Sequence, residues 1–190
     1  MRHQISLSWA ASSVGSSAWP SWVKQPAFAL DAAATDYSVS VADSCITEEM
    51  DALSVQNWFD LVTDQHKLFP VAWCNPPFSQ KKAFLQKAFE QSVNGFIMMM
   101  LPFAPATGWW RSLVTHRATT VFVPDGRYNF LNPVTGEIAP GSKFPTCFVL
   151  FSPLSQVCQW VEFERTDEKK LRNWLKANSL WFTIKPSKQT

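Results

Sequence analysis

The sequence predicts an α/β fold in which helices cover both faces of a mostly parallel sheet. Short apolar runs, typical of buried parallel strands, alternate with segments whose apolar residues recur at helical spacing. This alternation indicates strand-helix-strand units. The chain has 190 residues, of which 46% are hydrophobic, so it provides one core of ordinary size. We expect one domain over residues 1–153, beginning with an irregular lead-in, and an extension over residues 154–190 packed on it.

The expected strands are bounded by turn-forming residues. Ala27–Leu30 ends at Asp31, and Val71–Cys74 is stopped by two prolines, which cannot donate hydrogen bonds to a sheet. Phe96–Leu101 follows Gly95. Further extended segments are expected at Thr119–Val123, Thr146–Phe151 and Gln159–Phe163.

Helices are expected between these strands and in the extension. Ser79–Asn94 has apolar residues at helical spacing, with Ser79 as its N-cap. Thr107–His116 and Asp167–Ala177 are the other expected helices. Pro124–Pro145 is rich in Gly and Pro and is expected to be a long loop or hairpin, a type of segment that is usually functional.

Charge, cysteines and hydropathy restrict the function classes. Seventeen Lys and Arg against fifteen Asp and Glu give a net charge of +2, so any nucleic-acid site must be a local patch. The four cysteines contain no CxxC pair and the three histidines lie far apart, so we expect reduced thiols in a cytosolic protein and no metal site. The longest apolar run, Phe96–Leu101, falls far short of the roughly 20 residues of a membrane span.

The tetrapeptide Asn75-Pro76-Pro77-Phe78 is the motif that carries chemistry. It follows an apolar strand and precedes a helix, which is where α/β sheets bind ligands. The Asn75 side-chain oxygen and the Pro76 carbonyl are two acceptors that suit the two N–H donors of an exocyclic amino group. They would favour a tetrahedral nitrogen, whose localised lone pair can attack a methyl group. Phe78 offers a stacking face for a base, which must be flipped out of a duplex to reach it.

Two acidic segments provide context, because the tetrapeptide alone is equally typical of a stiff turn. Asp31, at the end of the first strand, is followed by Ala32 and Ala33, small residues that let a ligand approach the backbone. Asp51 is suited to accept from an adenine amino group while Leu53 covers the ring. The alternatives are a helix N-cap for Asp31 and a surface acid for Asp51.

In this order the motifs resemble those of the phage-type, Dam-like DNA N-6-adenine methyltransferases. The resemblance runs from about Phe28 to Pro153. The segments that carry it are Leu30–Ala34, Asp51–Leu53 with Trp58, Asn75–Phe78, Lys87-Ala88, Leu101-Pro102, Trp109-Trp110, Gly126-Arg127 with Phe130, and Phe148–Phe151.

The resemblance implies a Rossmann-like class I methyltransferase fold and a site-specific, adenine-specific DNA methyltransferase that uses S-adenosylmethionine. It also implies a phage or prophage protein that acts on double-stranded DNA in the bacterial cytoplasm and protects it from restriction. We therefore predict that the target base is held by Asn75, Pro76, Pro77 and Phe78, and that the cofactor is bordered by Asp31, Ala32, Ala33, Asp51 and Leu53.

Five cations near these motifs are candidate phosphate contacts, which would position DNA without reading its sequence. Each is equally typical of an exposed cation without a partner. They are Lys81, Lys82, Arg111, Arg127 and Lys143.

Two rival hypotheses remain open. The first is a binding protein that keeps this fold without catalysis, because the family's Trp-x-Thr-Pro element is missing and Ser38 and Ser44 stand where an Asn and a Tyr are expected. The second is methylation of RNA or of a protein glutamine, because both present an amino group next to a π system.

Overall fold

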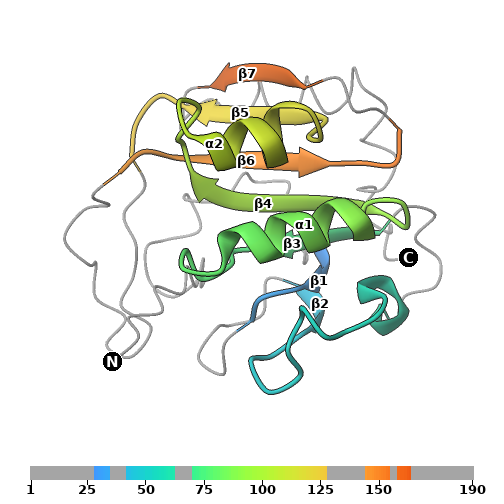
Figure 1. Cartoon of the computed structure of the whole chain (residues 1–190). Helices are drawn as coiled ribbons and strands as arrows, with labels where there is room; N and C mark the ends of the chain where they lie inside the picture. The colour runs from blue at the N-terminus through green and yellow to red at the C-terminus, as the bar shows by residue number, and fades with distance from the viewer. Residues whose placement is uncertain (1–27, 35–41, 63–69, 128–143, 155–157, 164–190) are drawn as a thin grey trace, which may run out of the picture.

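A single sheet organises the part of the chain that the structure describes. The computed structural model describes residues 28–34, 42–62, 70–127, 144–154 and 158–163. Among these residues seven strands pair in the order β2-β1-β3-β4-β6-β5-β7 (Figure 1). The strands are β1 (Phe28–Asp31), β2 (Ala42–Cys45), β3 (Val71–Cys74), β4 (Phe96–Pro102), β5 (Thr120–Pro124), β6 (Thr146–Phe151) and β7 (Gln159–Phe163).

Strand direction determines where the loops gather. Four of the six neighbouring pairs are parallel, and only β6 is antiparallel to its neighbours β4 and β5. The predicted α/β fold with a mostly parallel sheet is therefore confirmed. Most of Pro124–Pro145, the expected long loop or hairpin, lies outside the described residues. The carboxyl ends of the other strands face one edge of the sheet, at the left in Figure 1.

The described helices α1 and α2 lie together on one face of the sheet (Figure 1). Helix α1 spans Lys81–Gln91, and the short α2 (Gly108–Trp110) continues into the π-helix η2 (Arg111–Thr115). Helix α1 buries Phe84, Leu85 and Ala88 in the main apolar core. The helix predicted at 167–177 lies outside the described residues, so the cover predicted for the second face of the sheet is not described. None of the described helices has the length and hydropathy needed to cross a membrane.

A second apolar cluster is formed by side chains of strands β4, β5, β6 and β7. Phe96, Phe122 and Leu150 are almost fully buried, with Phe148 and Val161 packed against them. Val161 belongs to β7, so the predicted extension contributes a strand and a side chain to the packing of the same sheet. The irregular lead-in predicted before β1 lies outside the described residues.

Two elements were not predicted from the sequence, and one predicted cap is wrong. Strand β2 was missed because Asp43 and Ser44 interrupt its apolar pattern; its pairing with β1 holds it in the sheet. The 3-10 helix η1 (Trp58–Leu61) was also missed, although the Asn57 side chain caps it by accepting from the Phe59 amide. Ser79 is not the N-cap of α1, since residues 78–80 form a turn and Gln80 precedes the helix.

Gly95 lies where a side chain would collide with its surroundings. A Cβ atom there would stand 2.6 Å from Phe59 Cζ and 2.7 Å from the Pro70 carbonyl oxygen. Because backbone must move, we expect Gly95→Ala to lower the unfolding free energy by about 1–3 kcal/mol, measured by urea denaturation. Gly108→Ala is the control, since no atom lies within 4 Å of its added Cβ. Equal stability of the two variants would contradict this packing.

Candidate active site

A cavity of about 360 Å³ lies beside the loops that follow β1, β2 and β3. This volume falls within the roughly 300–1,000 Å³ typical of small-molecule sites. Three separate loops therefore share one hollow at the carboxyl edge of the sheet. The residues that line it are 32–34 after β1, 46–48 and 51–52 after β2, 76–80 after β3, and Phe84 of α1.

Backbone hydrogen bonds hold the first two loops together beyond the ends of their strands. The Ile46 amide donates to the Asp31 carbonyl at 2.8 Å, and the Ala34 amide donates to the Ile46 carbonyl at 3.1 Å. The Ala32 amide donates to the Trp73 carbonyl of β3 at 2.8 Å. The three alanines at 32–34 thus form a fixed wall whose short side chains leave the hollow open.

Asp31 is a buried acid at the base of this wall, 5% exposed. Its Oδ1 accepts a hydrogen bond from the Ala33 amide at 3.1 Å. Burial raises the pKa of Asp31 to about 6, against a smaller lowering by that hydrogen bond. The carboxyl is not among the groups that line the cavity, whereas Ala32 and Ala33 are. Asp31 therefore supports the predicted cofactor loop from beneath.

The raised pKa of Asp31 predicts a pH-dependent stability. Because its folded-state pKa exceeds its ordinary value of 3.8, the stabilising contribution is complete below about pH 4 and is lost as pH rises through about 6. Asp31→Asn keeps an acceptor for the Ala33 amide and removes this loss. We expect its unfolding free energy, relative to wild type, to grow by about 2–3 kcal/mol between pH 4 and pH 7.5. A pH-independent difference in urea denaturation would contradict the assignment.

The Asp51 loop approaches the cavity from the side of β2. Asp51 has a φ of 50°, unusual for a residue with a side chain. Its carboxylate accepts from the Leu53 amide at 3.2 Å and from the Ser54 hydroxyl at 2.6 Å, which stabilises this conformation. Asp51 and Ala52 line the cavity, whereas Leu53 packs against the core and does not line it. The structure thus brings the predicted acid to the hollow, but not the apolar side chain expected to cover a ring.

The Asn75-Pro76-Pro77-Phe78 loop forms the opposite wall. Pro76, Pro77 and Phe78 line the cavity, and Asn75 is half-buried next to them. The turn is closed by the Gln80 amide, which donates to the Pro77 carbonyl at 2.8 Å. The loop predicted from the sequence therefore lies between a strand and a helix, as expected, and opens onto a hollow.

Aromatic rings extend the Phe78 side of the loop. Phe78 meets Phe144 edge to face, with ring centroids 5.3 Å apart and an interplanar angle of 61°. Phe144, two residues before β6, therefore lies beside the predicted base-binding loop. Phe130, also part of the family resemblance, lies outside the described residues.

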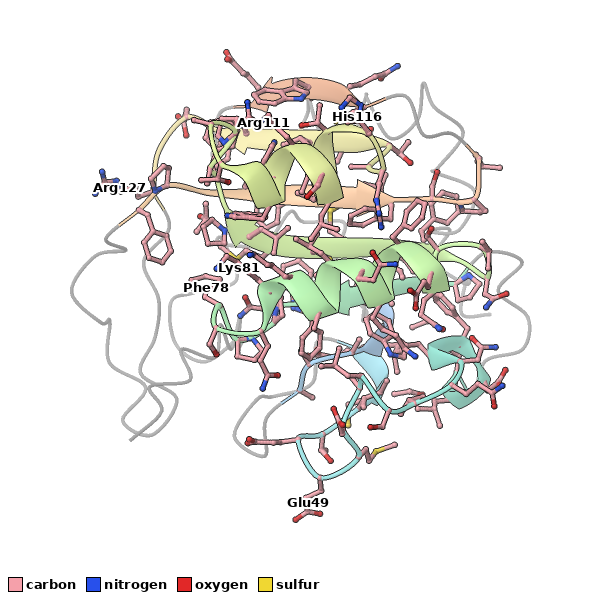
Figure 2. The ribbon with its side chains drawn as sticks, viewed as in Figure 1. Glu49, Phe78, Lys81, Arg111, His116 and Arg127 are labelled. Carbon is pink, nitrogen blue, oxygen red and sulfur yellow. The ribbon has the colours of Figure 1, made fainter. Side chains whose placement is uncertain are left out.

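The predicted DNA contacts differ in their surroundings. Lys81 is half-buried and its Nζ donates to the Phe78 carbonyl at 3.0 Å. Lys82, Arg111 and Arg127 are exposed. Figure 2 shows Lys81 and Arg127 toward the same edge of the sheet as Phe78. Lys143 lies outside the described residues.

Thr47 and Glu48 line the cavity although the sequence did not single them out as site residues. They follow β2, the strand that the sequence analysis missed because it contains polar residues. Their position after a strand could have indicated them. Because β2 is parallel to β1, the polar residues that follow β2 lie at the same edge of the sheet as the loop after β1. Among the described residues no group of three histidine, cysteine or acidic side chains could hold a metal ion.

Comparisons with known proteins agree on one family. A family model described as DNA N-6-adenine-methyltransferase (Dam) matches residues 21–175. A DNA N-6-adenine-methyltransferase of Haemophilus phage HP1 is 34% identical over 83 residues, covering 43% of this chain and 48% of that protein. One of Escherichia phage T1 is 24% identical over 170 residues, covering 75% of this chain and 67% of that protein. No solved structure matches the chain significantly.

The matches identify the family of this chain, although one of the two relatives is matched over only part of its length. The chain spans about half the length of the HP1 relative, where the match covers 48% of that protein. The family model, by contrast, covers well over half of this chain and includes every loop that lines the cavity. The chain belongs to the phage-type DNA N-6-adenine-methyltransferase (Dam) family.

Proposed function

We propose that this chain transfers a methyl group from S-adenosylmethionine to N6 of an adenine flipped out of double-stranded DNA. The observation that carries the proposal is the shared cavity. Its walls are the loops after β1 and β2, expected to hold the cofactor, and the Asn-Pro-Pro-Phe loop, expected to hold the target base. A donor lodged in this hollow would lie beside the acceptor loop, as methyl transfer requires.

The residues of the cavity fit the proposed cofactor. The backbone at 32–34 is approachable because its side chains are only methyl groups, and the cavity has the volume of a small-molecule site. Thr47, Glu48 and Asp51 contribute oxygen atoms that can accept from hydroxyl and amino groups. When bound, the cofactor would supply an electrophilic methyl group on a sulfonium.

Asn75 and Pro76 would act on the acceptor nitrogen. The Asn75 side-chain oxygen and the Pro76 carbonyl would each accept one hydrogen of the adenine amino group, which favours a tetrahedral nitrogen with a localised lone pair. Two fixed prolines and the closed turn at Gln80 hold the loop before the substrate arrives, so little reorganisation is needed. This role needs no side chain with a shifted pKa.

Phe78 would stack on the flipped base, an interaction worth about 1–3 kcal/mol per base. Its contact with Phe144 adds a second aromatic surface beside the loop. In this proposal the exposed cations Lys82, Arg111 and Arg127 contact phosphates, and the protein works in the cytoplasm of a bacterial host. Methylation there would protect phage DNA from restriction.

The decisive test is transfer of a tritiated methyl group to unmethylated DNA, followed by digestion to nucleosides. We expect the label in N6-methyldeoxyadenosine. RNA and a glutamine-containing protein, offered in competition with DNA, are expected to remain unlabelled. Label in RNA or in protein would favour the rival substrates. DNA binding without any label, together with a melting temperature that S-adenosylmethionine does not change, would favour a binding protein without catalysis.

A further inference from the structure

We propose that Lys81 is a positioning residue that fixes the Asn-Pro-Pro-Phe loop against helix α2, rather than a contact to DNA phosphate. The inference rests on the proposed function of that loop. It starts from two contacts made by one ammonium group. Lys81 Nζ donates to the Phe78 carbonyl at 3.0 Å, and the same atom lies 5.5 Å from the centroid of the Trp109 ring.

These contacts join the loop to aromatic residues that pack on the buried core. Trp109 packs edge to face on Trp110, with ring centroids 5.6 Å apart, and Trp110 is fully buried. Trp110 in turn meets Phe103 at 5.5 Å, just after β4. Lys81 thereby connects the Phe78 carbonyl to the aromatic cluster of Trp109, Trp110 and Phe103, which follows β4 in the chain.

Helix stability does not explain a lysine at this position. Lys81 is the first residue of α1, where the positive end of the helix dipole disfavours a cation. Lys82 follows it, the first turn contains no acidic residue, and Gln80 makes no side-chain cap. A sequence that breaks a local rule at the edge of a proposed active site indicates a functional constraint.

The half-buried position of Lys81 also separates it from its neighbour. Its ammonium already has a carbonyl and an aromatic face as partners, and moving it to a phosphate would break both contacts. Lys82 is exposed and is better placed for a phosphate. Loss of Lys81 is therefore expected to loosen the loop that presents Asn75, and displacement of a reacting group by about 1 Å can cost about 100-fold in rate.

The kinetic test compares Lys81→Met, Lys81→Arg and the matched control Lys87→Met, a lysine of the same helix that does not line the cavity. We expect Lys81→Met to lower kcat about 10- to 100-fold, with little change in the KM for S-adenosylmethionine or in the KM for DNA. Lys81→Arg, whose guanidinium can donate to the same carbonyl and lie over the Trp109 ring, is expected to retain more activity than Lys81→Met, within about threefold of wild type. A rate for Lys81→Met equal to that of Lys87→Met would overturn the proposal.

Salt dependence distinguishes positioning from phosphate contact. Loss of one phosphate contact lowers the slope of log Kd for DNA against log salt by about 0.9. We expect Lys81→Met to keep the wild-type slope. A slope reduced by about one, with kcat unchanged at saturating DNA, would assign Lys81 to the DNA backbone instead.

Amide hydrogen exchange tests the tie independently of catalysis, on the full chain without substrate. The Gln80 amide, bonded to the Pro77 carbonyl, reports on the turn. We expect it to exchange about tenfold faster in Lys81→Met than in wild type or Lys87→Met. If the wild type transfers no methyl group, the proposed function fails, but the exchange rate of the Gln80 amide still tests whether Lys81 holds the loop. Unchanged exchange in Lys81→Met would refute the tie even in an active enzyme.

Discussion

Asn75→Ala is expected to lower kcat for methyl transfer by about two to three orders of magnitude, while folding and cofactor affinity remain near wild type. The expected loss is that of a single fixed acceptor or donor in an oxyanion-hole type of site. Asn75 is half-buried and is not among the residues that line the cavity, so its truncation leaves the cofactor walls intact. The measurements are single-turnover methyl transfer, calorimetry with S-adenosylmethionine and thermal unfolding.

Asn75→Asp is the informative companion variant. It keeps an acceptor oxygen at the same position, so it should retain more activity than alanine. If Asn75→Ala keeps more than about a tenth of the wild-type kcat, the amide oxygen is not a principal acceptor, and the tetrapeptide is only a stiff turn. If cofactor affinity falls together with kcat, the loop supports the cavity and its role in the acceptor site is not separable.

The strands and loops that the sequence predicted well have sharp local boundaries. Val71–Cys74 and Thr146–Phe151 match β3 and β6 because each is an apolar run ended by proline or a polar turn. The same reasoning placed Asn75 and Phe78 at the carboxyl edge of the sheet. Their neighbourhood follows from topology, since parallel strands next to one another deliver their following loops to one place.

What the sequence did not show depends on tertiary contacts. Strand β2 has polar residues and exists through its pairing with β1, so periodicity alone misses it and the site residues Thr47 and Glu48 after it. Ala52 rather than Leu53 lines the cavity, because the core takes up Leu53 and Asp51 before them adopts a positive φ that no periodicity predicts. Of the two partners of Lys81, the Phe78 carbonyl lies three residues earlier in the turn before α1, whereas Trp109 belongs to α2 and no spacing rule brings it to Lys81.

Ala33→Phe is expected to raise the Kd for S-adenosylmethionine by about 100-fold or more. Ala33 lines the cavity of about 360 Å³ and is half-buried at the edge of the core, so a phenyl ring at this position is expected to occupy the hollow. The Asp31 hydrogen bond would persist because it uses the Ala33 backbone amide. A bound cofactor and the ring would then compete for one space, and a 100-fold loss corresponds to about 2.7 kcal/mol.

Ala83→Phe is the matched control, because Ala83 is exposed on α1 and lies outside the cavity. Both variants should unfold near the wild-type temperature, and only Ala33→Phe should lose cofactor binding in calorimetry. Unchanged affinity in Ala33→Phe would place the cofactor elsewhere and remove the link between the two halves of the cavity. The methyl donor would then have to approach the Asn-Pro-Pro-Phe loop from outside this cavity, because the cavity is the space that this loop shares with the loops after β1 and β2.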